Sequence, residues 1–370
     1  MKIALIFGTR PEAIKMAPIV KELKRQDDIE TIVCVTGQHR EMLDQVLDVF
    51  NIEPDYDLDI FKPGQSLTDI TVNSLQGIEK VLEKENPDVL LVQGDTTTVF
   101  SGALAAFYQQ IKIGHVEAGL RTGNIYSPYP EEANRKMVGT ITNYHFCPTD
   151  ANRQNLLKEG YKDEDIYITG NTVIDALKYT VKDDYVFADE KLNALDYENE
   201  KIILLTSHRR ENLGQPMKNI FSAVRDEIKD RKDVKVVFPI HLNPKVRDIA
   251  HEVFDGIDQV IFIEPLDYLP FTNLMNKVYL VMTDSGGVQE EAPSLGKPIL
   301  VLRNETERME GIEANTARLV GTDYEVIRKN LRELLDDKSA YDQMAHAQNP
   351  YGDGTAAEQI VKILKDLAAK

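Results

Sequence analysis

The chain has 370 residues, of which 42% are hydrophobic, and this length exceeds what one core usually serves, so two domains are expected. Its formal charge of −18 argues against DNA, RNA and anionic membranes as partners, since those require clustered lysine and arginine. The apolar start is too short for a signal peptide and no run of about 18 apolar residues occurs, so we expect a cytoplasmic protein.

Short apolar runs alternate with helical patterns from end to end, which is typical of βαβ units around parallel sheets. A first series of strands is predicted at Ile3–Phe7, Thr31–Val35, Val89–Val92, Ile113–Val116, Tyr144–Phe146 and Ile166–Ile168. A second series is predicted at Ile202–Thr206, Val234–Phe238, Gln259–Ile263, Tyr279–Met282 and Pro298–Val301.

The domains are predicted at 1–169 and 170–352, with the covalent hinge at Thr169–Asn171. A last helix, Ala356–Ala369 within the segment 353–370, is expected to pack back on the first domain. The two cysteines, Cys34 and Cys147, lie far apart in apolar contexts without metal-ligand spacing, so we expect buried free thiols.

Polar residues that follow the strands are the candidate site residues, because ligands of open parallel sheets bind beyond the carboxyl ends of the strands. The first strand leads into Gly8–Glu12, which places Arg10 and Lys15 near a helix N-terminus; the alternative is an ordinary turn with surface cations. Asp95 follows the strand Val89–Val92, where it could instead only cap the next helix.

Two further acids belong to this first series. Glu117 directly follows the strand Ile113–Val116, and Gly119 nearby permits a ligand to approach closely. Glu131 and Arg135 stand four residues apart and so share a helix face, an arrangement that by itself is more often a surface ion pair.

The second series repeats the pattern. His208 and Arg209 follow one strand and His241 follows the next, and two histidines at one sheet edge favour phosphate or hydroxyl contacts over a purely structural role. Ser285, Gly286 and Gly287 then follow a strand and open a helix, where backbone N–H groups and the helix dipole favour phosphate; the alternative is a tight turn.

These segments together closely resemble the non-hydrolysing UDP-N-acetylglucosamine 2-epimerases, and the likeness covers nearly the whole chain. The most specific pieces are Phe7–Ala13, Gly94–Thr98, His115–Arg121, Pro130–Glu132, Ser207–Asn212 and Thr283–Ala292. The resemblance implies an α/β protein of the GT-B fold, with two Rossmann-like domains facing a central cleft. It also implies a homodimer that uses no metal or nicotinamide cofactor and serves the biosynthesis of a cell-wall polysaccharide.

The resemblance further implies reversible inversion at carbon 2 between UDP-N-acetylglucosamine and UDP-N-acetylmannosamine, through elimination of UDP and a 2-acetamidoglucal intermediate. Catalytic groups around the sugar would be Asp95, Glu117, Glu131 and His208, assisted by Lys15 and Arg135. The nucleotide would be held by Arg10, Ser285, Gly286 and Gly287 at the diphosphate, Glu291 at the ribose, Phe271 at the uracil, and Arg308 at phosphate or ribose. Which carboxylate is the base and which the acid stays open.

A second pocket for UDP-N-acetylglucosamine, which promotes activity, is also implied by the resemblance. Its residues would be Gln38, His39, Glu41, Met42, Arg209 and His241. Two alternative enzymes remain: a hydrolysing epimerase that releases N-acetylmannosamine and UDP, and a GT-B glycosyltransferase. A non-catalytic nucleotide-sugar sensor is disfavoured because the acids of the site are all present.

Overall fold

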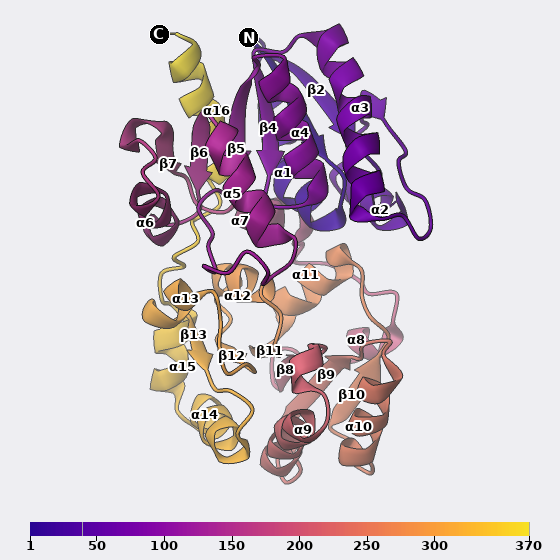
Figure 1. Ribbon diagram of the computed structural model, residues 1–370. Helices are drawn as coiled ribbons and strands as arrows, with labels where there is room; N and C mark the ends of the chain where they lie inside the picture. The colour runs from indigo at the N-terminus through magenta and orange to yellow at the C-terminus, as the bar shows by residue number, and fades with distance from the viewer. Residues whose placement is uncertain (39, 370) are drawn as a thin grey trace. The chain divides into compact units, whose positions relative to one another are not determined.

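A computed structural model describes residues 1–38 and 40–369, and they form two compact α/β units. The first unit comprises Met1–Tyr179 and Tyr351–Lys370, and the second comprises Thr180–Pro350. The expected α/β architecture of two Rossmann-like parallel sheets, as in GT-B enzymes, is confirmed (Figure 1).

The first unit is built on a seven-stranded parallel sheet in the order β3-β2-β1-β4-β5-β6-β7. Its strands are β1 (Lys2–Phe7), β2 (Glu30–Val35), β3 (Tyr56–Asp57), β4 (Val89–Gln93), β5 (Lys112–Val116), β6 (Tyr144–Cys147) and β7 (Ile166–Ile168). Its helices are α1 (Arg10–Leu23), α2 (Arg40–Phe50), α3 (Leu67–Glu85), α4 (Thr97–Tyr108), α5 (Glu131–Ile141), α6 (Asp150–Lys158), α7 (Thr172–Thr180) and α16 (Ala356–Ala368), with a 3₁₀ turn η1 (Asp163–Asp165).

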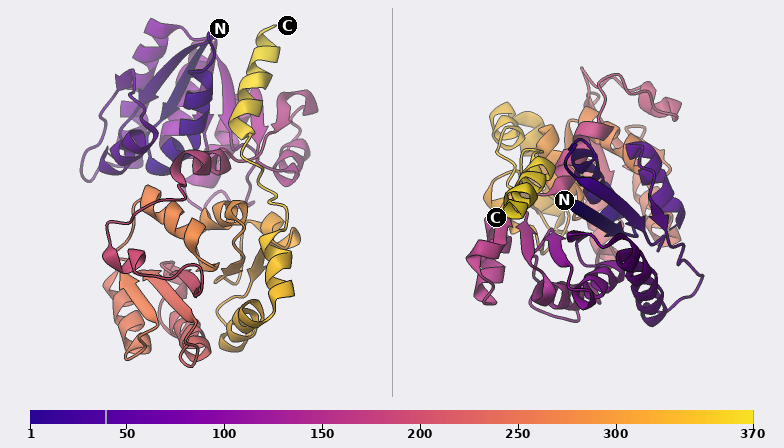
Figure 2. Two further views of the ribbon diagram at one scale, coloured as in Figure 1. Left: turned by 180° about the vertical axis from the view of Figure 1, so that it is seen from behind. Right: turned by 90° about the horizontal axis from the view of Figure 1, so that it is seen from above.

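Helices cover both faces of this sheet. Helices α3, α4 and α5 pack side by side on the face that is near the viewer in Figure 1. On the other face α1 packs against α2 and α16, and α16 is seen on the near side in the reverse view (Figure 2). The returning helix α16 is tied to this unit by Asp175 of α7, whose carboxylate accepts the N–H groups of Ala356 and Ala357 at 3.2 and 2.9 Å.

The second unit is built on a six-stranded parallel sheet in the order β10-β9-β8-β11-β12-β13. Its strands are β8 (Lys201–Thr206), β9 (Val234–Pro239), β10 (Val260–Ile263), β11 (Leu280–Thr283), β12 (Ile299–Val301) and β13 (Ala317–Leu319). Its helices are α8 (Glu190–Asn193), α9 (Gln215–Ile228), α10 (Pro244–Phe254), α11 (Tyr268–Lys277), α12 (Val288–Glu291), α13 (Met309–Glu313), α14 (Tyr324–Asp336) and α15 (Lys338–Ala345), with 3₁₀ turns η2 (Arg210–Asn212) and η3 (Ala292–Leu295).

Each unit has its own apolar core beneath its helices. In the first, strand residues such as Ile6 and Val92 pack with Val99 and Ala103 of α4. In the second, residues such as Phe238 of β9 pack with the inner faces of α9, α10 and α14. Both cysteines are free and buried, as expected. No described helix combines the length and apolarity that crossing a bilayer would require.

The strand order reverses once in each sheet. In the first unit β1 lies between β2 and β4, and in the second β8 lies between β9 and β11. The loops that leave β1 and β4 therefore diverge to opposite sides of the first sheet, as do the loops that leave β8 and β11 in the second. Ligands of open parallel sheets usually bind at such a point. Four of the motifs singled out in the sequence lie at the ends of these strands, namely Phe7–Ala13, Gly94–Thr98, Ser207–Asn212 and Thr283–Ala292, whereas His115–Arg121 lies at the end of β5.

Candidate functional site

The first candidate group is centred on Glu117, which follows β5. Its carboxylate lies 2.6 Å from the Lys15 ammonium through both oxygens, and the side-chain amides of Gln93 and Asn171 also donate to it. Glu117 itself has a φ of 62°, a left-handed conformation that is uncommon for a residue other than glycine. The carboxylate is thus held in one place beside a cation, as a catalytic acid or base requires.

The second candidate group pairs Asp95 with Arg135. The guanidinium donates from Nε at 2.8 Å and Nη2 lies 2.6 Å from the same Asp95 oxygen, while Asn134 donates to the Asp95 carbonyl at 2.8 Å. The alternative that Asp95 only caps α4 does not hold, because the cap is the hydroxyl of Thr96, which accepts from Val99 N–H.

The sequence suggested an ion pair between Glu131 and Arg135, but Arg135 pairs with other acids. Arg135 reaches across to Asp95 and backwards to the fully buried Glu132 at 2.9 Å. Glu131 is the first residue of α5 and is half-buried. Arg135 therefore serves to orient Asp95, and the structure does not bring Glu131 into this ion pair.

The loops that carry these groups are joined by Glu12, a residue that the sequence analysis did not single out. Its buried carboxylate accepts from the N–H groups of Gly8 and Thr9 at 3.1 and 2.7 Å and from the Thr96 hydroxyl at 2.7 Å. Burial raises the pKa of Glu12 although these hydrogen bonds act against the rise. The loop of Arg10, which opens α1, is thereby fixed to the loop of Asp95.

His115 fixes the peptide just before Asp95. Its Nε2 lies 2.7 Å from the Gly94 carbonyl oxygen, and because the ring is buried its pKa falls to about 4. A neutral ring must donate from Nε2 to a carbonyl, so the tautomer follows from the contact. The only signal for this role in the sequence was its place in the strand before Glu117.

The residues expected in a second pocket begin at the end of β2. Gln38 accepts a hydrogen bond from the Thr98 hydroxyl at 2.9 Å. Glu41 and Met42 are exposed in the first turn of α2. His39 lies outside the described residues.

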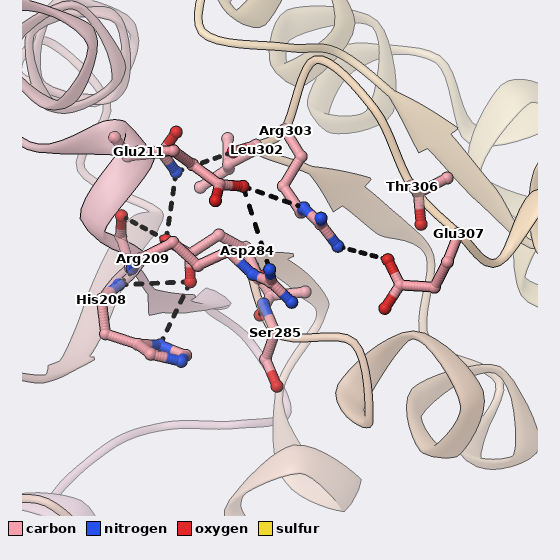
Figure 3. A network of polar contacts seen from close by, with 12 residues as sticks. His208, Arg209, Glu211, Asp284, Ser285, Leu302, Arg303, Thr306 and Glu307 are labelled. Carbon is pink, nitrogen blue, oxygen red and sulfur yellow. Dashed lines mark hydrogen bonds and ion pairs between the residues drawn. The ribbon is translucent and has the colours of Figure 1, made fainter. Parts of the chain in front are cut away.

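The second unit centres on Asp284, which directly follows β11 and is fully buried (Figure 3). One carboxylate oxygen lies 3.1 Å from Nδ1 of His208. The other accepts from the N–H groups of His208 and Arg209 at 2.9 and 3.0 Å, the Ser207 hydroxyl at 3.0 Å and the Asn212 amide at 3.1 Å.

Asp284 was quoted in a motif but not predicted as a site residue. Burial alone would raise its pKa, yet the hydrogen bonds and the charge of His208 together lower it. Arg209 is attached through Nε to the Asp284 carbonyl at 2.7 Å. The His208 ring stacks on His241 with centroids 5.7 Å apart, so the two predicted histidines do lie together.

The loop Ser285–Gly287 runs directly from Asp284 into α12. The Ser285 N–H already donates to the Thr283 hydroxyl at 2.9 Å, so the backbone groups of Gly286 and Gly287 are the candidates for phosphate in this loop. At Gly286 a Cβ would come within 2.7 Å of Arg308 Nη1, so glycine is required for the guanidinium to lie against the backbone.

Arg308 is held over this loop by two acids. Its Nε donates to Glu290 at 2.7 Å, and its Nη1 pairs with Glu307. Burial alone would raise the pKa of Glu307, but Arg308 and Arg303 outweigh it, and the pKa falls to about 2. Arg308 therefore brings a guanidinium beside the glycines, as a diphosphate site needs.

The predicted nucleoside contacts lie on neighbouring elements. Glu291 ends α12 and is buried, and its carboxylate is 3.9 Å from where a Cβ on Gly287 would stand. Phe271 is half-buried on α11, whose first residue is Tyr268. Burial, and secondarily the charge of Glu291, raises the pKa of Tyr268 well above its ordinary value.

No group of three or more histidine, cysteine, aspartate or glutamate side chains in residues 1–38 and 40–369 is arranged to hold an ion. The arrangement instead offers fixed carboxylates with cationic partners in the first unit and glycine N–H groups, a guanidinium and an Asp–His pair in the second.

Known proteins are similar to this chain in sequence and in fold. A family model described as UDP-N-acetylglucosamine 2-epimerase matches residues 21–365. The UDP-N-acetylglucosamine 2-epimerase of Bacillus subtilis is 55% identical over 365 residues, which cover 98% of this chain and 95% of that protein. The structure of the Staphylococcus aureus MnaA protein with UDP is 50% identical with a TM-score of 0.88, covering 100% of this chain and 97% of the other. The Neisseria meningitidis UDP-GlcNAc 2-epimerase bound to UDP-GlcNAc is 47% identical with a TM-score of 0.86, covering 99% and 100%.

Proposed function

Because the chain belongs to the UDP-N-acetylglucosamine 2-epimerase family, we propose that it interconverts UDP-N-acetylglucosamine and UDP-N-acetylmannosamine and releases no free sugar. The observation that carries the proposal is the fixation of Asp95 and Glu117, each beside its own cation, at the carboxyl edge of one sheet. Inversion of a carbon centre needs acid and base groups held in place, and this pair supplies them.

The chemistry explains why a diphosphate site is also needed. The proton on carbon 2 is not next to a carbonyl, so its direct removal would be very slow. When the bond from carbon 1 to the UDP oxygen breaks, positive charge develops on the ring and a carboxylate can take the carbon 2 proton. The products are 2-acetamidoglucal and UDP, and re-addition of UDP with protonation of the opposite face gives the epimer.

The residues are assigned to these steps as follows. Asp95, Glu117 and Glu131 exchange protons or stabilise charge at the sugar, and His208 stabilises charge where the diphosphate leaves the sugar. Lys15 and Arg135 hold two of the acids. Departure of UDP is assisted by Arg10, Arg209, Arg308, Ser285 and the N–H groups of Gly286 and Gly287, which stabilise the negative charge on the diphosphate. Glu291 binds the ribose and Phe271 the uracil.

The test is turnover in heavy water. Epimerised UDP-N-acetylmannosamine should carry deuterium at carbon 2, because the removed proton exchanges before the opposite face is protonated, and nuclear magnetic resonance reads this directly. Free N-acetylmannosamine formed in equal amount to UDP would instead establish the hydrolysing reaction. Turnover only after a sugar acceptor is added would establish a transferase.

We also propose that the protein is a homodimer and acts in the cytoplasm without a metal or nicotinamide cofactor. Light scattering should give twice the chain mass of 41.9 kDa. Dialysis against a chelator should leave turnover unchanged. A monomeric mass or loss of activity on chelation would overturn the corresponding part.

A further inference from the structure

Asp284 accepts hydrogen bonds from four residues of a single loop. Its donors Ser207, His208, Arg209 and Asn212 all belong to the segment that leaves β8. Taking a carboxylate out of water is costly unless its oxygens are paired, and here both are. Because Asp284 is also the residue before Ser285, one side chain joins the His208 loop to the loop with the candidate phosphate-binding glycines.

Asp284 contacts the side chain of His208 as well as its backbone. Both the backbone N–H and the ring nitrogen Nδ1 of His208 contact the Asp284 carboxylate, as the dashed lines in Figure 3 show. An ionised carboxylate only accepts, so Nδ1 must carry a proton. Nε2 lies on the opposite side of the ring, the His208 side chain is 41% exposed, and His241 stacks on one ring face.

We propose that Asp284 is a positioning residue that fixes the His208 imidazole with Nδ1 protonated, so that Nε2 is the nitrogen presented to the substrate diphosphate. The inference rests on the proposed function, since it assigns a supporting residue to that reaction. Because Nδ1 donates to Asp284, the ring can also donate from Nε2 to a phosphate oxygen when Nε2 is protonated. Rotation of the ring by 180° would break the contact with Asp284. The same carboxylate also accepts the Arg209 N–H and so fixes the backbone position of Arg209.

A spectroscopic test uses the unsubstituted protein and needs no turnover. Ring-¹⁵N-labelled histidine reports which nitrogen carries the proton, and His208→Gln identifies the His208 signal among the seven histidines. We expect the neutral ring of His208 in the unliganded protein to be the Nδ1–H tautomer, and we expect saturating UDP to favour the ring protonated on both nitrogens, because Nε2 then donates to a phosphate oxygen. A neutral ring protonated at Nε2 would overturn the proposal, and this readout does not depend on the folding of an Asp284-substituted protein.

A kinetic test separates positioning from simple loop support. Asp284→Asn keeps the size of the side chain but offers an amide to Nδ1, and in a Ser–His–Asp triad the same exchange costs about 10⁴-fold in turnover because the tautomer is wrong. We expect kcat to fall about 100-fold or more with KM changed less than about threefold, the range for loss of one hydrogen-bond donor that stabilises developing negative charge. Asp323→Asn is the matched control, because the Asp323 carboxylate caps α14 by accepting the Val326 N–H.

A double-substitution cycle completes the test. If Asp284 acts through His208, the protein with both Asp284→Asn and His208→Gln should turn over no more slowly than the His208→Gln protein. Additive losses, or an Asp284→Asn protein in which KM rises and kcat stays normal, would overturn the positioning role. If the unsubstituted enzyme does not epimerise in heavy water, the proposed function fails, whereas the tautomer measurement decides the Asp284–His208 pairing by itself.

Discussion

Lys15 and Glu117 are brought into contact from elements far apart in the chain, with the ammonium 2.6 Å from each carboxylate oxygen. Lys15 lies in the second turn of α1, and Glu117 is the first residue after β5. We expect Lys15→Met to lower kcat at least about tenfold, because it removes the cation that holds this carboxylate. Lys21→Met, on the same helix and with its ammonium on the Asn51 carbonyl, should leave kcat unchanged. Steady-state kinetics on both substituted proteins tests this prediction. Equal kcat values for the two proteins would show that the Lys15–Glu117 pair is structural.

The three acids of the first unit should be separable from nucleotide binding. Asp95→Asn, Glu117→Gln and Glu131→Gln should each lower turnover about 100-fold or more, as is usual when an acid or base is lost. UDP affinity, measured by calorimetry, should stay within a few fold. Glu164→Gln, on an exposed turn, serves as the control. Near-normal turnover in all three substituted proteins would refute the assignment of these carboxylates.

Acid should weaken the first unit through two buried histidines. Burial lowers the pKa of His115 to about 4 and of His145 to about 3, from an ordinary 6.5. Between pH 6.5 and about 4 these rings are therefore protonated in the unfolded chain but not in the folded chain. The free energy of unfolding consequently decreases as pH falls, by up to about 1.4 kcal/mol per pH unit for each ring.

Substitution of His145 tests this expected loss of stability at acid pH. It is buried, its Nδ1 has no partner among the described residues, and the ring packs edge-on against Tyr161 at 4.9 Å. His145→Phe should keep the packing and make the loss of stability in denaturant unfolding between pH 6.5 and 4 less steep. An unchanged slope would show that His145 titrates normally in the folded protein.

Activation by a second substrate molecule should be visible in the reverse reaction. Starting from pure UDP-N-acetylmannosamine, we expect a lag that a trace of UDP-N-acetylglucosamine abolishes, because the activator favours the active state. Gln38→Ala, which loses the contact with Thr98, should weaken the effect without changing UDP affinity, whereas Gln45→Ala, exposed on α2, should not. A reverse reaction at full rate from the start would remove the allosteric proposal and leave the epimerase proposal intact.

The amino-acid sequence was sufficient to predict every strand of both sheets except the edge strands β3 and β13. Periodicity and apolar runs report local burial, and the central strands are buried on both faces, so their signal is strong. Tyr56–Asp57 has only two residues and Arg318 interrupts Ala317–Leu319, so neither segment shows an apolar run, and each pairs with the free edge of a neighbouring strand. The loops with glycine and acidic residues were also evident, since they follow the strands directly.

Only the tertiary structure decided which charged groups meet. The sequence suggested Glu131 for Arg135, but parallel pairing of β4 and β5 and the packing of α5 on α4 place Asp95 within reach instead. Likewise Asp284 and His208 are joined only because β11 pairs with β8, with Thr283 beside Thr206. Local pattern cannot specify such contacts, since they depend on the order of strands in the sheet. That order sets the partner of each carboxylate on which the proposed chemistry depends.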